Sequence, residues 1–256
     1  MELVFVGAGR LATNFARTLC GQGHRVCAVY SRTLASASAL TDAVGGFPTD
    51  DIAALPKSAD AYILAVKDDI LPTLIPQLRK DREGQAFFHT AGSVPLTVFG
   101  NHACCGVIYP LQTFSKERMV DFSRVHIFIE GQTPHALSIA RQIASSVSQH
   151  VTELSSPDRR QLHLAAVFAC NFSNHCYTLA ADILQRCGLG FDALLPLVEE
   201  TACKVKAMHP RQAQTGPAMR YDRTVIDAQS QLLADEPLTQ KIYELMSKSI
   251  HQHCSE

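Results

Sequence analysis

Two stretches of the chain hold more polar side chains than packing requires. One is His89-Thr90-Ala91-Gly92-Ser93, directly after an apolar run, and the other is a helical pattern with His163 and Asn171 two turns apart. An imidazole can donate or accept a proton near neutral pH, and an asparagine inside an apolar helix has to find hydrogen-bond partners, which a cleft provides. We therefore expect His89, Ser93, His163 and Asn171 to line a catalytic site in which protons are transferred.

The spacing of polar residues in the second stretch predicts one face of a long helix. Residues three or four positions apart are neighbours on a helix surface, and this spacing relates His163, Val167, Asn171, Asn174 and Thr178. The adjacent apolar residues are expected to form core: Leu164, Ala165, Phe168 and Phe172. Two interpretations stay open for this face. It contacts a substrate, or it holds a core histidine with satisfied hydrogen bonds and an asparagine that pairs helices.

The start of the chain has the pattern of a strand, a tight turn and a helix. Apolar residues Leu3–Val6 precede Gly7-Ala8-Gly9, and an amphipathic pattern begins at Arg10. With Ala12, the glycines fit the G-x-G-x-x-[GA] spacing of dinucleotide-binding folds, where glycines make the turn and let a pyrophosphate approach the backbone. The first helical amides, including that of Leu11, then point at the phosphates. Gly7, Gly9, Arg10 and Leu11 are therefore predicted to bind a dinucleotide.

The end of the second expected strand indicates which dinucleotide binds. An acidic residue about 20 positions after the glycines would hold the ribose of NAD, but the chain has Ser31-Arg32-Thr33 there. A guanidinium flanked by hydroxyls suits a 2′-phosphate. In the alternative, Ser31 and Thr33 only cap the next helix and Arg32 lies in solvent. We expect Ser31, Arg32 and Thr33 to select NADP over NAD.

Apolar runs and helical patterns alternate over the first half of the chain. After the first strand, further strands are expected near Arg25–Tyr30, Gly45–Thr49, Ala61–Val66, Ala86–His89, Gly106–Tyr109 and Val125–Ile129. This alternation predicts an α/β fold with a doubly wound, mostly parallel Rossmann sheet. Ligands bind at the carboxyl ends of such strands. Val66, Lys67 and Thr90 are therefore added to the predicted cofactor site.

The pattern changes near residue 154. Ser155-Ser156-Pro157-Asp158 is typical of a helix start, and helices are expected at about 158–186, 191–208, 222–233 and 238–251. We therefore predict an NADP-binding domain over residues 1–153 and an all-α domain over residues 154–256. Four amphipathic helices leave apolar faces uncovered, which predicts a homodimer through the helical domain. The alternative is a closed bundle that rests on the first domain.

Composition narrows the class of protein. The 256 residues are 46% hydrophobic and 18% charged, with a net charge of −1, so we expect a folded protein with no nucleic-acid or membrane partner. Because an expected strand opens the chain, we expect no signal peptide and a cytoplasmic protein. The nine cysteines form no C-x-x-C pair. No metal site is predicted, although His251-x-His253-Cys254 could catch a metal in vitro.

Several of these segments resemble known proteins. The glycine turn, Ser31-Arg32-Thr33 and the strand end Ala65-Val66-Lys67 resemble the Rossmann domain of pyrroline-5-carboxylate reductase and F420-dependent NADP oxidoreductase, although Asp68 replaces the reductases' proline. The whole chain is similar to a family of Rossmann-like proteins with a helical C-terminal domain of unknown function. The segments that carry this likeness are His89–Ser93, Tyr109–Phe114, His163–Phe172 and Thr215–Asp222. The resemblance implies an NADP-binding fold and dimerisation through the helical domain, and it implies no substrate.

Two functions remain open. An NADP-dependent oxidoreductase would transfer hydride to or from a small carbonyl or imine substrate, with His163 or water as proton source. A non-catalytic NADP-binding sensor or partner-binding dimer would keep the fold and lose the chemistry. Related hydroxyacid dehydrogenases use a lysine and an asparagine one turn apart on the long helix, whereas Val167 precedes Asn171 by one turn. The lack of an obvious acid–base pair favours the second function, and the polar helix face favours the first.

Overall fold

The computed structural model describes residues 1–254. Backbone contacts divide it into two compact units, Met1–Asn171 and a second that starts at Phe172, and each is described by itself. The predicted domain boundary lies between residues 153 and 154, where the last strand ends at Glu153 and the next helix begins at Ser156. That helix belongs to the first unit by its contacts. The two-domain boundary stays a prediction.

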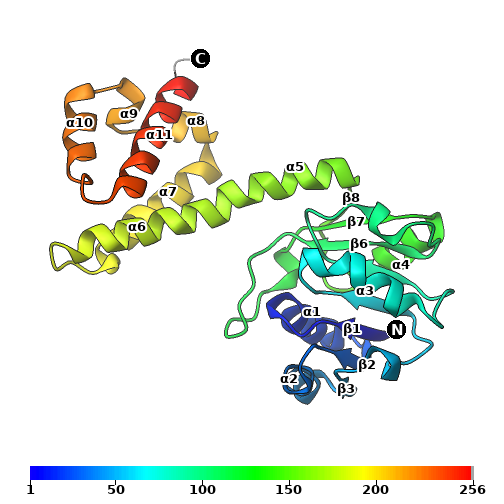
Figure 1. The fold of residues 1–256 in the computed structure, drawn as a ribbon. Helices are drawn as coiled ribbons and strands as arrows, with labels where there is room; N and C mark the ends of the chain where they lie inside the picture. Colours follow the sequence, from blue (N-terminus) through cyan, green and yellow to red (C-terminus); the bar gives the residue numbers. More distant parts are fainter. Residues whose placement is uncertain (255–256) are drawn as a thin grey trace. The chain divides into compact units, whose positions relative to one another are not determined.

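The first unit is built on a sheet in which the described residues form eight strands (Figure 1). The strands are β1 (Glu2–Val6), β2 (Arg25–Tyr30), β3 (Phe47–Thr49), β4 (Ala61–Leu64), β5 (Phe87–His89), β6 (Cys105–Pro110), β7 (Ile127–Gly131) and β8 (Val151–Glu153). Their order is β3-β2-β1-β4-β5-β6-β7-β8, and only the β6–β7 pair is antiparallel. The first six follow the order of a dinucleotide-binding fold. The predicted mostly parallel Rossmann sheet is confirmed, with β8 as a strand that the sequence did not reveal.

Alternate residues of β1 explain why helices cover both faces of the sheet. Leu3 and Phe5 pack in a core with α1 (Arg10–Gly21), α2 (Leu34–Val44) and α4 (Pro134–Ser145). Val4 and Val6 pack on the other face with four leucine and isoleucine side chains of α3 (Leu71–Arg79). Successive side chains of a strand point to opposite faces, so a run that is apolar throughout is buried between two helical layers.

The parallel strands end at one edge of the sheet, which positions the predicted site residues. β1 ends before Gly7, β2 before Ser31, β4 shortly before Val66, and β5 at His89. Short 3₁₀ turns follow in several of these connections, at Ile52–Ala54, Asp68–Ile70, Leu96–Phe99 and Phe122–Arg124. Ligands of doubly wound sheets bind at this edge.

The helix after β8 starts as predicted, but it is not regular over its length. Helix α5 spans Ser156–Ala166, and the Ser155 side chain caps it by accepting from the Asp158 amide at 3.3 Å. A π-helical segment, Val167–Phe172, comes next and precedes α6 (Ser173–Gln185). Each π-helical turn holds more residues than an α-turn. The predicted single α-helical face from His163 to Thr178 is therefore wrong, because the spacing rule applies to α-helices only.

The second unit is helical, as predicted. It contains α6, α7 (Leu195–Ala207), α8 (Pro210–Ala213), α9 (Pro217–Arg220), α10 (Arg223–Gln231) and α11 (Pro237–Cys254), with a 3₁₀ turn at Phe191–Leu194. Helix α11 packs against α9 and α10, and the buried apolar side chains there are few: Ala218, Ile226 and Leu233. The short helices α8 and α9 were not predicted, since four residues give no periodicity to detect.

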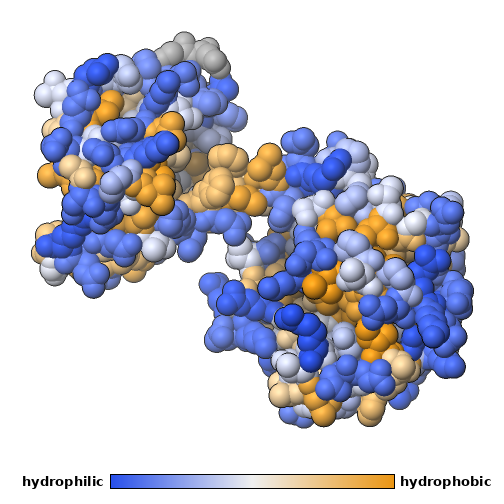
Figure 2. Space-filling view, in the orientation of Figure 1, coloured by the Kyte–Doolittle hydropathy of each residue, from blue (hydrophilic) through white to orange (hydrophobic). Residues whose placement is uncertain are grey.

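Apolar side chains of α5, the π-helical segment and α6–α7 lie at the surface of the chain. Leu164, Phe168 and Phe172 are 53%, 62% and 49% exposed, so the prediction that they form core is wrong for the single chain. Figure 2 shows apolar side chains at the surface where these helices run in Figure 1. Burial of such side chains is favourable, and within residues 1–254 each of these three keeps about half of its surface exposed or more. None of the helices within residues 1–254 is long and apolar enough to cross a membrane.

Candidate functional site

A hollow of about 300 Å³ lies at the carboxyl ends of β1, β2 and β4. Six of the residues predicted to bind the cofactor line it: Gly7, Gly9, Ser31, Arg32, Val66 and Lys67. The sequence did not single out the other lining residues, which are Ala8, Tyr30, Ser36, Ala65, Ile70 and Leu74. Their positions beside the glycine turn and the strand ends were the available signal. The structure thus brings together residues from three separate predicted segments.

The two glycines of the first turn have different geometry. Gly7 has φ +111°, and a Cβ on it would stand 2.2 Å from the Ala65 carbonyl oxygen. Its amide donates to the Tyr30 carbonyl at 2.8 Å. Gly9 has φ −78°, and a Cβ there would meet no atom within 4 Å. Gly7 is therefore required by the fold. Gly9, which lines the hollow, has open space where a side chain would stand.

Helix α1 presents an uncapped N-terminus beside this turn. Its N-cap residue, Gly9, has no side chain to accept from the first-turn amides, and the first turn holds no acidic residue. Uncapped amides and the positive end of the helix dipole suit a phosphate. Arg10 and Leu11 belong to this turn, and neither side chain lines the hollow. Their predicted contribution is therefore limited to the backbone amides.

Arg32 supplies a positive charge to the hollow. Its side chain lines the hollow, and it forms no ion pair with any residue in the described chain. The Thr33 hydroxyl donates to the Ser36 hydroxyl at 2.8 Å, and it does not cap the backbone of α2. Thr33 thus reaches the hollow only through Ser36. A free guanidinium beside hydroxyls is the arrangement expected for a bound phosphate monoester.

Thr90 does not reach this hollow. It is buried, and both its amide and its hydroxyl donate to the Leu64 carbonyl, at 3.2 and 3.3 Å. The hydroxyl that was assigned to the cofactor therefore extends the pairing between β5 and β4.

A hydrogen-bonded pair of side chains stands farther along the same edge. The Tyr109 hydroxyl, at the end of β6, lies 2.9 Å from Nδ1 of His163 on α5. Gly92 makes this approach possible, because a Cβ on it would lie 2.5 Å from His163 Nδ1 and 2.9 Å from Tyr109 Cζ. The polar loop after β5 and the predicted histidine of the helix are thus in contact. Tyr109 was missed as a site residue, although its segment carried the family resemblance.

Burial keeps the Tyr109 phenol protonated. Desolvation is the main cause that raises its pKa to about 12, with smaller contributions from the charges of Asp68 and Cys170 and an opposing one from Arg159. A second polar pair lies close by, in which the Ser93 hydroxyl donates to the Asp68 carboxylate. Asp68 directly follows Lys67, which lines the hollow. The two pairs therefore adjoin the predicted cofactor site.

His89 has surroundings that do not suit a proton donor. It is fully buried and stacks on Phe99 with ring centroids 5.6 Å apart, and its Nδ1 accepts from the Ala91 amide at 3.2 Å. Burial is the main cause that lowers its pKa to about 3, the Arg159 charge lowers it further, and a backbone interaction with Pro95 opposes both. At neutral pH the imidazole is uncharged. His89 therefore supports the loop after β5 from the interior, and its predicted catalytic role does not suit these surroundings.

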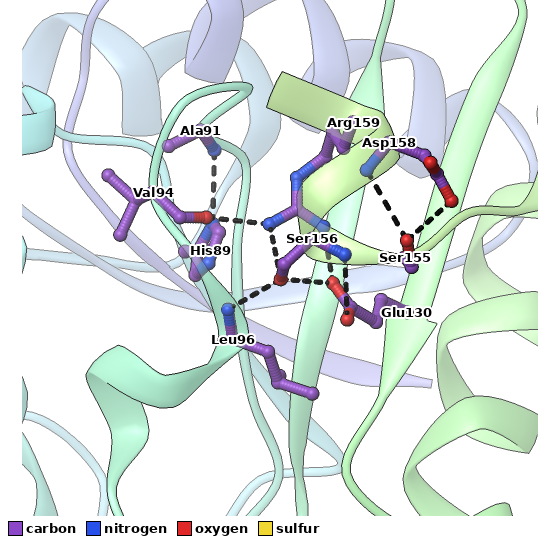
Figure 3. A network of polar contacts seen from close by, with 9 residues as sticks. All are labelled: His89, Ala91, Val94, Leu96, Glu130, Ser155, Ser156, Asp158 and Arg159. Carbon is purple, nitrogen blue, oxygen red and sulfur yellow. Dashed lines mark hydrogen bonds and ion pairs between the residues drawn. The ribbon is translucent and has the colours of Figure 1, made fainter. Parts of the chain in front are cut away.

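A buried ion pair fixes the start of α5 on the sheet (Figure 3). The Arg159 side chain is fully buried and donates to Glu130 of β7 at 2.5 Å and to the Val94 carbonyl at 2.6 Å. The Ser156 hydroxyl donates to the same glutamate at 2.7 Å and accepts from the Leu96 amide at 2.8 Å. His163 lies one turn after Arg159, so these contacts set where it meets Tyr109.

Asn171 and Asn174 are exposed in the chain. Asn171 lies in the π-helical segment and Asn174 in α6. An exposed Asn171 can hydrogen-bond to water, so it needs no partner inside the helix of the single chain. The catalytic role of Asn171 stays a prediction. Within residues 1–254, no group of three or more His, Cys, Asp and Glu side chains is arranged to hold a metal ion, and that includes His251, His253 and Cys254.

Comparison with known proteins identifies the family. Residues 2–89 match the family described as NADP oxidoreductase, coenzyme F420-dependent, and residues 125–250 match a domain of unknown function, DUF2520. A candidate NADP oxidoreductase from Bacteroides fragilis, of known structure, is 45% identical; the match covers 98% of each chain with a TM-score of 0.94. The chain belongs to this family of NADP oxidoreductases. The predicted family and its cofactor, NADP, are thus confirmed.

More distant structures share the fold of this NADP oxidoreductase. A protein from Thermotoga maritima is 23% identical over 99% of this chain and 98% of its own, with a TM-score of 0.72. An imine reductase from Myxococcus stipitatus, solved with NADP⁺, is 14% identical over 98% of this chain and 93% of its own, with a TM-score of 0.69. No curated protein matches the chain.

Proposed function

We propose that this NADP oxidoreductase reduces a small carbonyl or imine compound with NADPH. The observation that carries the proposal is the Tyr109–His163 pair, which stands at the same sheet edge as the hollow with Arg32 and Gly9. A reductase needs a cofactor site and a proton source side by side. The fold shared with an NADP⁺-bound imine reductase adds support for this substrate class.

The residues of the hollow fit NADP. Gly9 leaves room for the pyrophosphate, the first-turn amides of α1 face it, and Arg32 with Ser31 and Ser36 would hold the 2′-phosphate. When bound, NADPH supplies a hydride to the carbon of the C=O or C=N bond and becomes NADP⁺. Val66 and Lys67 line the same hollow and would contact the cofactor, and Asp68, the partner of Ser93, follows Lys67 in the chain.

Tyr109 and His163 would deliver the proton that the reduced oxygen or nitrogen requires. A phenol with a pKa of about 12 holds its proton until a strongly basic group forms beside it, which is an alkoxide from a ketone or a nitrogen anion from a neutral imine. When Nδ1 of His163 carries a proton, it donates to the phenol oxygen and leaves the phenol proton for the substrate. The same Nδ1–H then stabilises the phenolate that forms as Tyr109 gives up its proton, and water restores that proton. Proton transfer by a positioned side chain contributes about 10²–10⁴ in rate.

The Asp68–Ser93 pair favours an imine substrate over a ketone. An imine that takes its proton from Tyr109 before hydride transfer becomes positively charged and needs no proton afterwards, and the Asp68 carboxylate would stabilise that charge next to the hollow. Its hydrogen bond from Ser93 also orients the serine oxygen, which can still accept from a substrate N–H. Asn171 is retained as a further predicted contact to substrate, to be tested by turnover in Asn171→Ala and Asn171→Leu.

A screen of carbonyl and imine compounds for NADPH oxidation tests the proposal. Once a substrate is found, Tyr109→Phe is expected to lower kcat by at least about 10²-fold, with NADPH affinity nearly unchanged. Tyr62→Phe is the matched control, since Tyr62 is also buried in the sheet and donates to the Pro56 carbonyl. If Tyr109→Phe retains full kcat, or if NADPH binds and no compound is reduced, the non-catalytic sensor replaces the enzyme.

We also propose that a second copy of the chain covers the exposed apolar faces of α5–α7. Leu164 and Phe168 in the first unit and Leu197 in the second are each more than half exposed, and exposed apolar patches mark interaction sites. Symmetric homodimers are the commonest oligomers. Sedimentation at micromolar concentration should give a dimer for the wild type and a larger share of monomer for Phe168→Glu, and a wild-type monomer would contradict the proposal.

A further inference from the structure

A second hollow, of about 640 Å³, is formed by the loop that joins β6 to β7. Its polar lining residues are Gln112, Thr113, Ser115, Arg118, Asp121 and Arg124. The volume lies within the range of about 300–1,000 Å³ that is usual for small-molecule sites. None of these residues lines the cofactor hollow, so the two hollows share no lining residue.

The loop is long and well anchored. Residues 111–126 join two antiparallel neighbours, where about two to five residues would suffice. Asn14 of α1, fully buried, donates to the Ser115 carbonyl at 2.7 Å and accepts from the Val120 amide at 3.0 Å. Phe114 and Phe122 stack with centroids 5.7 Å apart at the core. The loop around the hollow is therefore ordered by its own contacts, because the buried Asn14 side chain hydrogen-bonds two of its backbone groups.

The charges of this hollow favour an anion. Arg118 and Arg124 line it, and neither forms an ion pair with any residue of the described chain. Asp121 already accepts from the Ser123 hydroxyl at 2.7 Å and from its amide at 3.1 Å. These two bonds and, to a smaller extent, the nearby Arg124 charge lower the pKa of Asp121. Two guanidinium groups with no carboxylate at ion-pair distance, beside hydroxyl and amide groups, match a carboxylate by bidentate hydrogen bonds.

The place of the hollow in the fold connects it to the proposed reaction. Its first lining residue, Gln112, follows the end of β6, and Tyr109 belongs to that same strand end. We propose that Arg118 and Arg124 bind the carboxylate of the substrate, which makes a 2-oxo acid or its imine the substrate class. This inference rests on the proposed function, because it assigns the Tyr109–His163 pair to the reacting end of the same molecule.

The test is calorimetric titration of the protein, with and without NADPH, by three kinds of probe. The probes are the 2-oxo acids pyruvate and 2-oxoglutarate, their methyl esters, and dihydroxyacetone phosphate. The variants are Arg118→Gln and Arg124→Gln, with Lys116→Gln as control, since Lys116 is exposed in the same loop and does not line the hollow. A 2-oxo acid should bind the wild type. Its methyl ester should bind the wild type at least about tenfold more weakly, and the acid should bind each arginine variant at least about tenfold more weakly than it binds the wild type.

Lys116→Gln should stay within about threefold of the wild type, because it removes a charge from the loop without removing a ligand. The proposal is overturned if the esters bind as well as the acids, if Lys116→Gln loses as much as the arginine variants, or if no acid binds at about 10 mM. Tighter binding of dihydroxyacetone phosphate than of either acid overturns the carboxylate in favour of a phosphate. Failure of NADPH to bind the wild type would contradict the proposed function, whereas bound NADPH without bound acid contradicts only this inference.

Discussion

Replacement of Arg159 by methionine should destabilise the first unit strongly. Loss of one partner of a buried ion pair costs about 3–5 kcal/mol, and the Arg159 side chain is 0% exposed. Glu130 is 18% exposed and keeps hydrogen bonds from the Ser156 amide and hydroxyl, at 3.0 and 2.7 Å. Arg159 Nε, moreover, is buried without a partner. The cost is therefore expected near the lower limit, about 3 kcal/mol.

Thermal unfolding followed by circular dichroism measures this loss. For a unit of this size, a loss of about 3 kcal/mol corresponds to a fall in Tm of about 6–12 °C. Arg160→Met is the control, because Arg160 is the exposed neighbour on the same helix, and its Tm should change by less than about 2 °C. If Arg159→Met unfolds within about 2 °C of the wild type, or if both variants lose equally, then the ion pair does not fix α5 on the sheet.

Two further predictions concern the glycine turn and His89. Gly9→Val should fold and lose NADPH binding, measured by fluorescence titration. Gly7→Val should fail to fold, because its Cβ meets the Ala65 carbonyl. Normal NADPH affinity in Gly9→Val would show that the hollow is not the cofactor site. Since the pKa of His89 falls from an ordinary 6.5 to about 3 on folding, the unfolded state binds more protons in that window, and stability should fall as pH falls from 6.5 to 3. Urea titrations should show a flatter dependence in His89→Gln and an unchanged one in the exposed control His135→Gln, and equal slopes in all three proteins would contradict the account of His89.

The sequence allowed the sheet and most of the cofactor hollow to be predicted, because their signals are local. Leu3–Val6 is apolar throughout, as a strand between two helical layers requires, and the glycine turn has a spacing that the backbone geometry demands. The structure adds that, of the two glycines in this turn, Gly7 has a positive φ and Gly9 has a negative one. The antiparallel pairing of β7 was not predicted, since strand direction depends on how the chain returns to the sheet.

The polar residues near the reacting end were only partly predictable. His163 was identified from its position on an apolar helix, but its partner Tyr109 is 54 residues away in sequence, and such pairings are set by the fold. His89 and His163 were both predicted to transfer protons because both are histidines in polar segments. Burial and the nearby Arg159 charge lower the pKa of His89, so that its imidazole stays uncharged. The π-helical segment also has no periodicity signal in a single sequence, so the predicted face through Asn171 assumed a regular α-helix.

The central claim is that the hollow binds NADPH through Arg32, and a pair of titrations tests it most directly. NADPH and NADH are titrated by fluorescence against the wild type, Arg32→Ala and, as control, Arg17→Ala, whose exposed arginine lies on α1 outside the hollow. Arg32→Ala should weaken NADPH binding by about 1–3 kcal/mol, the worth of a charge-assisted hydrogen bond, and leave NADH binding nearly unchanged. Arg17→Ala should change neither. Equal losses for both nucleotides in Arg32→Ala, or wild-type affinity for NADPH, would contradict the account.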